Sequence, residues 1–190
     1  VIALNGMYRE SSRNSTSNPS SKRWSIRHYL KPGDVGYLIY LHGILYAEEY
    51  GYDRTFEPYV AGSLAGFVQS FNSDEDRIWV AEIDGRTVGS IAIVGHSRAV
   101  AQLRWFLVHP DYRELGLGRE LIEEAILFCR ERRYKSVFLW TTNELSVARH
   151  LYISLGFRRT EEKAHRIWGK DVAEERYDLR LRNKMDQEIL

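Results

Sequence analysis

Two kinds of hydrophobic spacing meet in the middle of the chain, and their meeting point marks a strand followed by a helix. Residues 103–108 form a short apolar run rich in strand-forming side chains, which Pro110 closes. From Leu117 to Cys129 the apolar residues recur every three or four positions, as on one face of a helix. The glycine-containing segment 113–118 therefore lies where the predicted strand passes into the predicted helix.

The same patterns predict the remaining elements, in the order β-α-α-β-β-β-α-β-α-β-β, which indicates an α/β protein. Strands are expected at residues 24–30, 78–83, 87–94, 100–108, 136–141, 157–168 and 172–181. Helices are expected after the Pro32-Gly33 break to about Tyr50, at 56–71, at 116–133, and from Thr142 or Asn143 to about Leu155. We expect hairpin turns at Asp84-Gly85, a type I′ pair, and around Gly169-Lys170.

Length and composition indicate one soluble domain and argue against several classes of function. The chain has 190 residues, of which 44% are hydrophobic and 28% charged, as in ordinary globular proteins. Its net charge of +1 gives no basic excess for nucleic acid, and no apolar run approaches the ~18 residues of a membrane span. The single cysteine, Cys129, cannot form an internal disulfide, which favours a cytoplasmic location.

The N-terminal part of the chain differs in composition from the rest. Residues 9–23 are rich in serine and asparagine, so residues 1–23 are expected to form a flexible tail or linker and residues 24–190 the folded domain. The chain begins with Val1 and not with methionine, which leaves a preceding domain open. A homodimer is likewise left open.

The glycine segment is the strongest candidate for chemistry. A helix start offers unpaired backbone N–H groups and a partial positive charge, which together suit a phosphate. Gly116 and Gly118 would let the backbone approach such an anion closely. A dinucleotide-binding loop is the competing interpretation, but it requires a third spaced glycine and an acidic residue about 20 positions further on. Apolar residues around Phe138 occupy that later position, which disfavours a dinucleotide.

Two segments carry a family resemblance. The segment 113–118, Arg-Glu-Leu-Gly-Leu-Gly, resembles the signature with which GNAT N-acetyltransferases bind the pyrophosphate of acetyl-CoA. The segment 143–157 is similar to the second signature of that family and contains Tyr152. The resemblance implies the GNAT fold, a mixed and twisted central sheet of about seven strands with helices on both faces.

The N-terminal half adds a more specific resemblance. Segments 28–37 and 46–52 look like the acetyltransferase part of bacterial fusions with a MarR-type DNA-binding domain. In such fusions a winged-helix domain comes first, and no winged-helix sequence precedes these segments here. We therefore expect no nucleic-acid partner for this chain itself, and an upstream DNA-binding domain only in a longer parent.

The GNAT resemblance also implies acetyl-CoA as co-substrate and the residues that would hold it. In this family the strand before the loop splays from the next strand, and its backbone pairs with the pantetheine arm instead. The implied binding residues are Phe106, Leu107, Val108, Arg113, Glu114, Leu115, Gly116, Leu117, Gly118, Arg119 and Asn143. Asn143 is equally suited to cap the following helix.

The implied reaction is transfer of an acetyl group to an amine, on a small molecule or a peptide, by direct attack. Tyr152 is the candidate general acid, because a phenol with a pKa near 10 stays protonated at neutral pH and suits a thiolate near 8.5. Glu49 is the candidate base, ahead of Glu48 and His42. No cluster has metal-ligand spacing, so no metal is expected. A catalytically silent acyl-CoA sensor of the same fold is the alternative function.

Overall fold

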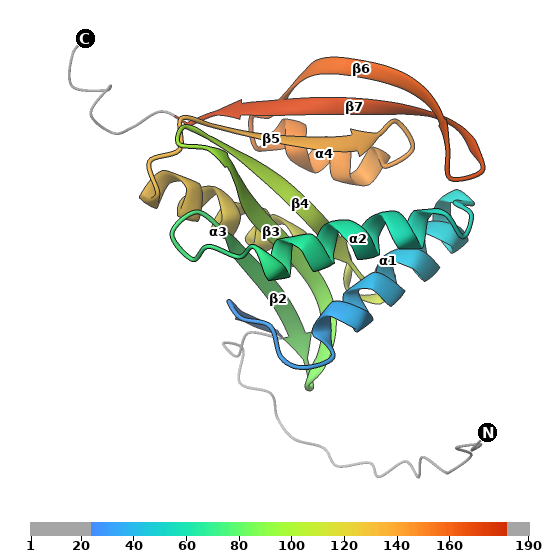
Figure 1. Cartoon of the computed structure of the whole chain (residues 1–190), viewed down its shortest axis with the longest axis horizontal. Helices are drawn as coiled ribbons and strands as arrows, with labels where there is room; N and C mark the ends of the chain where they lie inside the picture. The colour runs from blue at the N-terminus through green and yellow to red at the C-terminus, as the bar shows by residue number, and fades with distance from the viewer. Residues whose placement is uncertain (1–23, 182–190) are drawn as a thin grey trace.

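The computed structural model describes residues 24–181 and contains one seven-stranded sheet in the order β1-β2-β3-β4-β5-β7-β6 (Figure 1). The strands are β1 (Ser25–Arg27), β2 (Arg77–Ile83), β3 (Arg86–Ser97), β4 (Val100–Val108), β5 (Ser136–Thr142), β6 (Arg158–Ile167) and β7 (Lys170–Arg180). The helices are α1 (Asp34–Tyr50), α2 (Phe56–Gln69), α3 (Leu117–Glu131) and α4 (Ser146–Ser154), with a short 3₁₀ turn at Pro110–Tyr112. Predictions for segments 1–23 and 182–190 fall outside the described residues.

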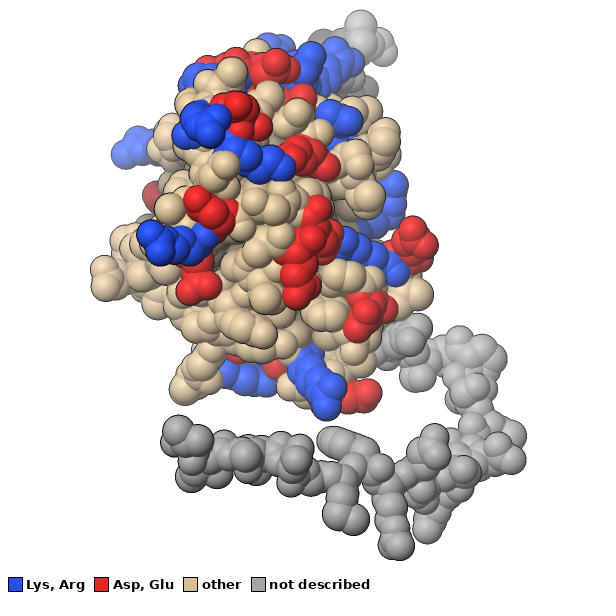
Figure 2. Space-filling view, turned by 90° about the vertical axis from the view of Figure 1, so that its right-hand side faces the viewer, with Lys and Arg blue, Asp and Glu red and all other residues tan. Residues whose placement is uncertain are grey.

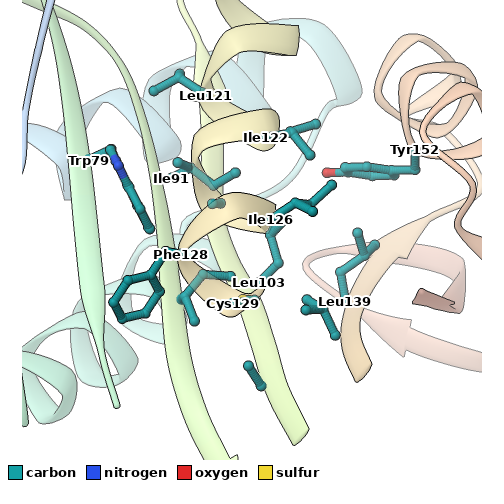
Figure 3. Packing of buried hydrophobic residues seen from close by; sticks show 14 of the residues in the cluster. Trp79, Ile91, Leu103, Leu121, Ile122, Ile126, Phe128, Cys129, Leu139 and Tyr152 are labelled. Carbon is teal, nitrogen blue, oxygen red and sulfur yellow. The ribbon is translucent and has the colours of Figure 1, made fainter. Parts of the chain in front are cut away.

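Helices cover both faces of the sheet, as predicted, because successive side chains of each strand point to opposite sides. On β2, Ile78 and Val80 pack beneath α1 and α2, in a cluster that includes Leu38 and Leu64. Trp79 lies on the opposite face, in the cluster that surrounds α3 (Figure 3). The mixed α/β architecture is therefore confirmed.

The sheet opens between β4 and β5. These two strands are parallel and pair only where residues 100–102 meet residues 136–138, and Figure 1 shows them diverging beyond that point. A β-bulge lies in the part of β4 that pairs with β3 but not with β5, and Trp105 adopts a positive φ of 46° there. The Ser90 hydroxyl on β3 donates a 2.7 Å hydrogen bond to the carbonyl of Trp105, which fixes the bulge from the neighbouring strand.

The turns follow the prediction in one hairpin and shift by one residue in the other. Asp84 and Gly85 have φ of 49° and 74°, which confirms the type I′ turn between β2 and β3. In the closing hairpin the positive-φ pair is Trp168 and Gly169, at 52° and 84°, one residue before the expected position. Trp168 consequently sits at the turn, where its side chain projects toward α2 and not along a strand.

The start of α4 contradicts the sequence prediction. The helix begins at Ser146 after Leu145, so neither Thr142 nor Asn143 caps it. Instead, the N–H of Asn143 donates to the carbonyl of Ala173 at 3.0 Å, and its Oδ1 accepts from the N–H of Ala173 at 3.3 Å. Asn143 thereby prolongs the pairing of β5 with β7 and does not cap α4.

Charged residues are mixed on the surface, and no described helix could cross a membrane. Figure 2 shows acidic and basic side chains interspersed among uncharged ones, without a broad patch of one sign on that face. Among residues 24–181 no helix is long and apolar enough to span a bilayer.

Candidate active site

Two adjoining cavities lie where β4 and β5 separate. The larger, of about 470 Å³, is here called the large cavity, and it is walled by residues of α1, α2, β4, β5, α4 and the closing hairpin. The smaller, of about 300 Å³, is here called the loop groove, and it is walled by α1, the end of β4, the glycine segment and α4. Tyr46, Phe106 and Leu145 line both, so the two cavities meet beside the bulge of β4.

The loop groove has the backbone expected of an anion site. Gly116 precedes α3 with a φ of 91°, and Glu114 also has a positive φ of 62°. This conformation turns the chain sharply so that the N-terminus of α3 faces the groove. A Cβ on Gly118 would lie 3.3 Å from the Phe106 ring, so a side chain there would crowd the groove. These residues fit a pyrophosphate on geometric grounds.

Arg113 connects three elements around the groove. Its Nε donates to the carbonyl of Val108 at 2.9 Å, and its two terminal nitrogens donate to both carboxylate oxygens of Glu49 at 2.7 Å each. The pKa of Arg113 is raised, chiefly by the hydrogen bonds that it donates to the Glu49 carboxylate. Both Glu49 oxygens are occupied, and Glu49 lines the loop groove but not the large cavity. This arrangement disfavours Glu49 as a general base.

Not all of the predicted co-substrate residues line the loop groove. The groove is lined by Phe106, Leu107, Val108, Arg113, Glu114, Gly116, Gly118 and Arg119. Leu117 is fully buried in the core around α3, and Leu115 and Asn143 do not line the groove. Arg119 donates to the Ser154 hydroxyl at 3.0 Å, which ties the start of α3 to the end of α4.

Tyr152 occupies the position between the core and the large cavity. It is 4% exposed and lines that cavity. Its ring centroid lies 6.0 Å from the ring centroid of Phe106 and 5.9 Å from that of Phe157. Figure 3 shows its hydroxyl turned away from α4 toward Ile122 on α3. Burial raises the pKa of Tyr152, so the phenol keeps its proton at neutral pH. That state is the one a general acid requires.

His42, one of the two other bases considered from the sequence, is buried in the wall of the large cavity. Its Nδ1 lies 2.8 Å from the carbonyl of Leu38, which requires the proton on Nδ1. Burial lowers the pKa of His42 to about 4, so the ring is neutral at pH 7. Its Nε2 has no hydrogen-bond partner among the described residues.

Sequence reasoning missed two residues that wall the large cavity. Arg104 on β4 lines it, with its guanidinium 4.6 Å from the Trp105 ring centroid. Trp168 also lines it, and its ring centroid lies 4.9 Å from the ring centroids of both Tyr52 and Phe56. Regular alternation along β4 was a usable signal for Arg104. Nothing in the sequence indicated that the last hairpin would reach α2.

Comparisons with known proteins show the family to which the chain belongs. The sequence model of the acetyltransferase (GNAT) domain matches residues 74–159. An uncharacterized N-acetyltransferase of Schizosaccharomyces pombe is 30% identical over 122 residues, which are 63% of this chain and 74% of the relative. The Xenopus tropicalis protein described as probable N-acetyltransferase camello is 30% identical over 144 residues, 72% of this chain and 64% of that protein. The chain therefore belongs to the GNAT acetyltransferase family.

A solved structure supports the fold. A GNAT family acetyltransferase from Elizabethkingia anophelis, determined with acetyl-CoA bound, superposes with a TM-score of 0.61 at 14% identity, covering 85% of this chain and all of the other. The chain spans about 55–64% of the length of camello and two further curated relatives. Among the described residues, no group of three or more His, Cys, Asp or Glu side chains is placed to hold a metal.

Proposed function

We propose that this chain transfers the acetyl group of acetyl-CoA to an amine that enters the large cavity. The observation that carries the proposal is that the two cavities meet at the bulge of β4, where this strand no longer pairs with β5. Tyr152 lines the large cavity beside this junction. The loop groove suits the pyrophosphate, and segment 106–108 has backbone groups free of β5 to pair with the pantetheine arm. The thioester would then lie between the groove and the large cavity.

Acetyl-CoA supplies an activated thioester, whose C–S bond breaks as the new C–N bond forms. Tyr152 donates its phenolic proton to the departing sulfur and recovers one from solvent. Proton donation of this kind contributes about 10²–10⁴-fold to a rate. The proton lost by the amine passes to water, since no described carboxylate lines both cavities where they meet.

Glu49 and Arg113 act together on the co-substrate side. With both oxygens bound to Arg113, Glu49 holds the guanidinium in one orientation, and Arg113 in turn holds the end of β4 through Val108. A fixed guanidinium loses less rotamer freedom when it meets a phosphate. Glu49 is therefore proposed as a positioning residue and no longer as the base. For Asn143, whose Oδ1 bonds β7, a co-substrate contact stays a prediction.

One observation favours a second candidate, a silent acyl-CoA sensor. Glu174 is the single carboxylate in the wall of the large cavity, and its Oε2 lies 3.1 Å from Nε2 of His165. Among the described residues the cavity wall thus offers few groups that could take a proton from an amine, and a sensor would need none. A homodimer, a cytoplasmic location and a DNA-binding domain in a longer parent stay predictions.

Two measurements separate these functions. Calorimetry with CoA tests the groove, and thiol release from acetyl-CoA with a panel of amines tests transfer. The enzyme requires CoA binding together with thiol release that depends on an amine. CoA binding without such release supports the sensor, and absence of CoA binding contradicts both.

A further inference from the structure

The wall of the large cavity is dominated by aromatic rings. They come from five separate parts of the fold, namely α1, α2, the adjacent strands β4 and β5, α4, and the turn between β6 and β7. The eight rings among the described residues are Tyr46, Phe56, Tyr59, Trp105, Phe106, Trp140, Tyr152 and Trp168. Such a wall suits a molecule with a large apolar or aromatic group, since ring contacts add stabilisation beyond the area they bury.

The charged side chains in the same wall are unevenly balanced. Arg104 and Lys163 are cations, and the single carboxylate, Glu174, lies against His165. Lys163 already pairs with Glu161, at 2.8 Å between Nζ and Oε1. Among residues 24–181, Arg104 has its stacking contact with Trp105 and no carboxylate partner. The cavity therefore presents an uncompensated guanidinium beside an aromatic surface.

Building on the proposed function, we propose that the acceptor is an α-amino acid with a large apolar or aromatic side chain, whose carboxylate binds Arg104. Guanidinium groups bind carboxylates through paired hydrogen bonds, which Arg104 has free to offer. A polyamine acceptor fits less well, because several positive charges would face one carboxylate and two cations, Arg104 and Lys163.

The position of Arg104 agrees with this orientation. Arg104 precedes Phe106 by two residues across the bulge at Trp105, so their Cα atoms lie at most about 7 Å apart. Phe106 lies where the two cavities meet and where the thioester is proposed to lie. The amine of an α-amino acid is one carbon away from its carboxylate, so binding of the carboxylate at Arg104 keeps the amine near the reacting carbonyl.

The test compares three acceptors that differ only in the substituent on the carbon atom that bears the amino group. Free phenylalanine carries a carboxylate, phenylalaninamide a neutral amide, and phenethylamine neither. The value of kcat/KM is measured for each with saturating acetyl-CoA and expressed per neutral amine, because the three amines differ in pKa. A hydrogen-bonded charge of this kind changes an affinity by about 10–100-fold, so we expect free phenylalanine to exceed the other two by at least tenfold.

Variants assign the preference to Arg104. Arg104→Gln should bring the ratio of phenylalanine to phenethylamine close to one, and Arg104→Lys should restore part of it. Arg98→Gln, at the exposed turn before β4, should keep the parent ratio. CoA calorimetry and thermal unfolding show whether each variant is folded, and the conservative lysine variant keeps the test decisive if glutamine disturbs the strand.

The outcomes separate the inference from the proposed function. A parent ratio near one, or a high ratio that survives in Arg104→Gln, overturns the carboxylate inference. Transfer to phenethylamine in that case still supports the acetyltransferase. Failure of all three amines and of a broader amine panel, with CoA binding intact, overturns both. A high ratio that disappears with Arg104 supports the inference.

Discussion

The two cavities are built in different ways. Half of the residues that line the loop groove belong to one continuous segment, 106–119, in which the backbone of Gly116 and Gly118 opens the start of α3. The large cavity is formed by side chains that five or more separate elements bring together. A backbone site fits one constant anionic group, whereas a wall of side chains can change with each substitution. The groove is accordingly suited to an invariant co-substrate and the large cavity to a particular acceptor.

The largest effect is expected in the groove. Gly118→Asp adds a Cβ 3.3 Å from the Phe106 ring and a carboxylate where a pyrophosphate would bind. Loss of two charge-assisted hydrogen bonds, at about 1.5–3 kcal/mol each, corresponds to a hundredfold or greater loss of CoA affinity. Calorimetry measures it. Gly62→Asp on the exposed side of α2, where a Cβ meets nothing within 4 Å, is the matched control. A folded Gly118→Asp variant that binds CoA like the parent refutes the groove assignment.

Tyr152→Phe probes the junction of the cavities and should mainly change kcat. The ring and its packing remain, so the melting temperature should change little, while kcat falls by about 10². Affinity for CoA should stay the same. Tyr29→Phe, at a tyrosine that is 61% exposed, controls for loss of a phenol as such. Unchanged kcat in a folded variant would make Tyr152 a core tyrosine without a catalytic role.

The pH dependence of kcat in the parent protein also tests Tyr152 as the general acid. Because burial raises the pKa of Tyr152 above its ordinary value near 10, the acid form persists through the neutral and mildly alkaline range. We expect no loss of kcat from ionisation of Tyr152 below about pH 10. A fall of kcat between pH 7 and 9 that is absent from Tyr152→Phe would contradict this assignment.

The smallest effect is expected from Glu49→Gln. The pair with Arg113 lies near the surface, where such ion pairs contribute about 0.2–1 kcal/mol, so CoA affinity should fall by at most about fivefold. At saturating acetyl-CoA, kcat should equal that of the parent. Glu48→Gln, one residue away on α1, should change neither quantity. A large fall in kcat with normal CoA affinity would instead restore Glu49 as the base.

The difference between features built from neighbouring residues and features built from distant ones also explains what the sequence predicts well. Local spacing indicated the strand and helix around segment 113–118 and the type I′ turn at Asp84-Gly85, because neighbouring residues determine these features. Glu49 and Asn143 were assigned roles that depend on distant partners, namely Arg113 and Ala173, which one sequence does not reveal. Trp168 went unrecognised because its cavity exists only after the last hairpin reaches α2.

The central claim is that the two cavities join a CoA thioester to an amine. Its most direct test is the stoichiometry of a single reaction, in which free thiol and acetylated amine are quantified together from acetyl-CoA and the best acceptor. The account predicts one acetylated amine for each thiol released, with both products lowered equally in Tyr152→Phe. Saturable CoA binding, with thiol release at the same rate whether or not an amine is present and no acetylated product, would contradict it.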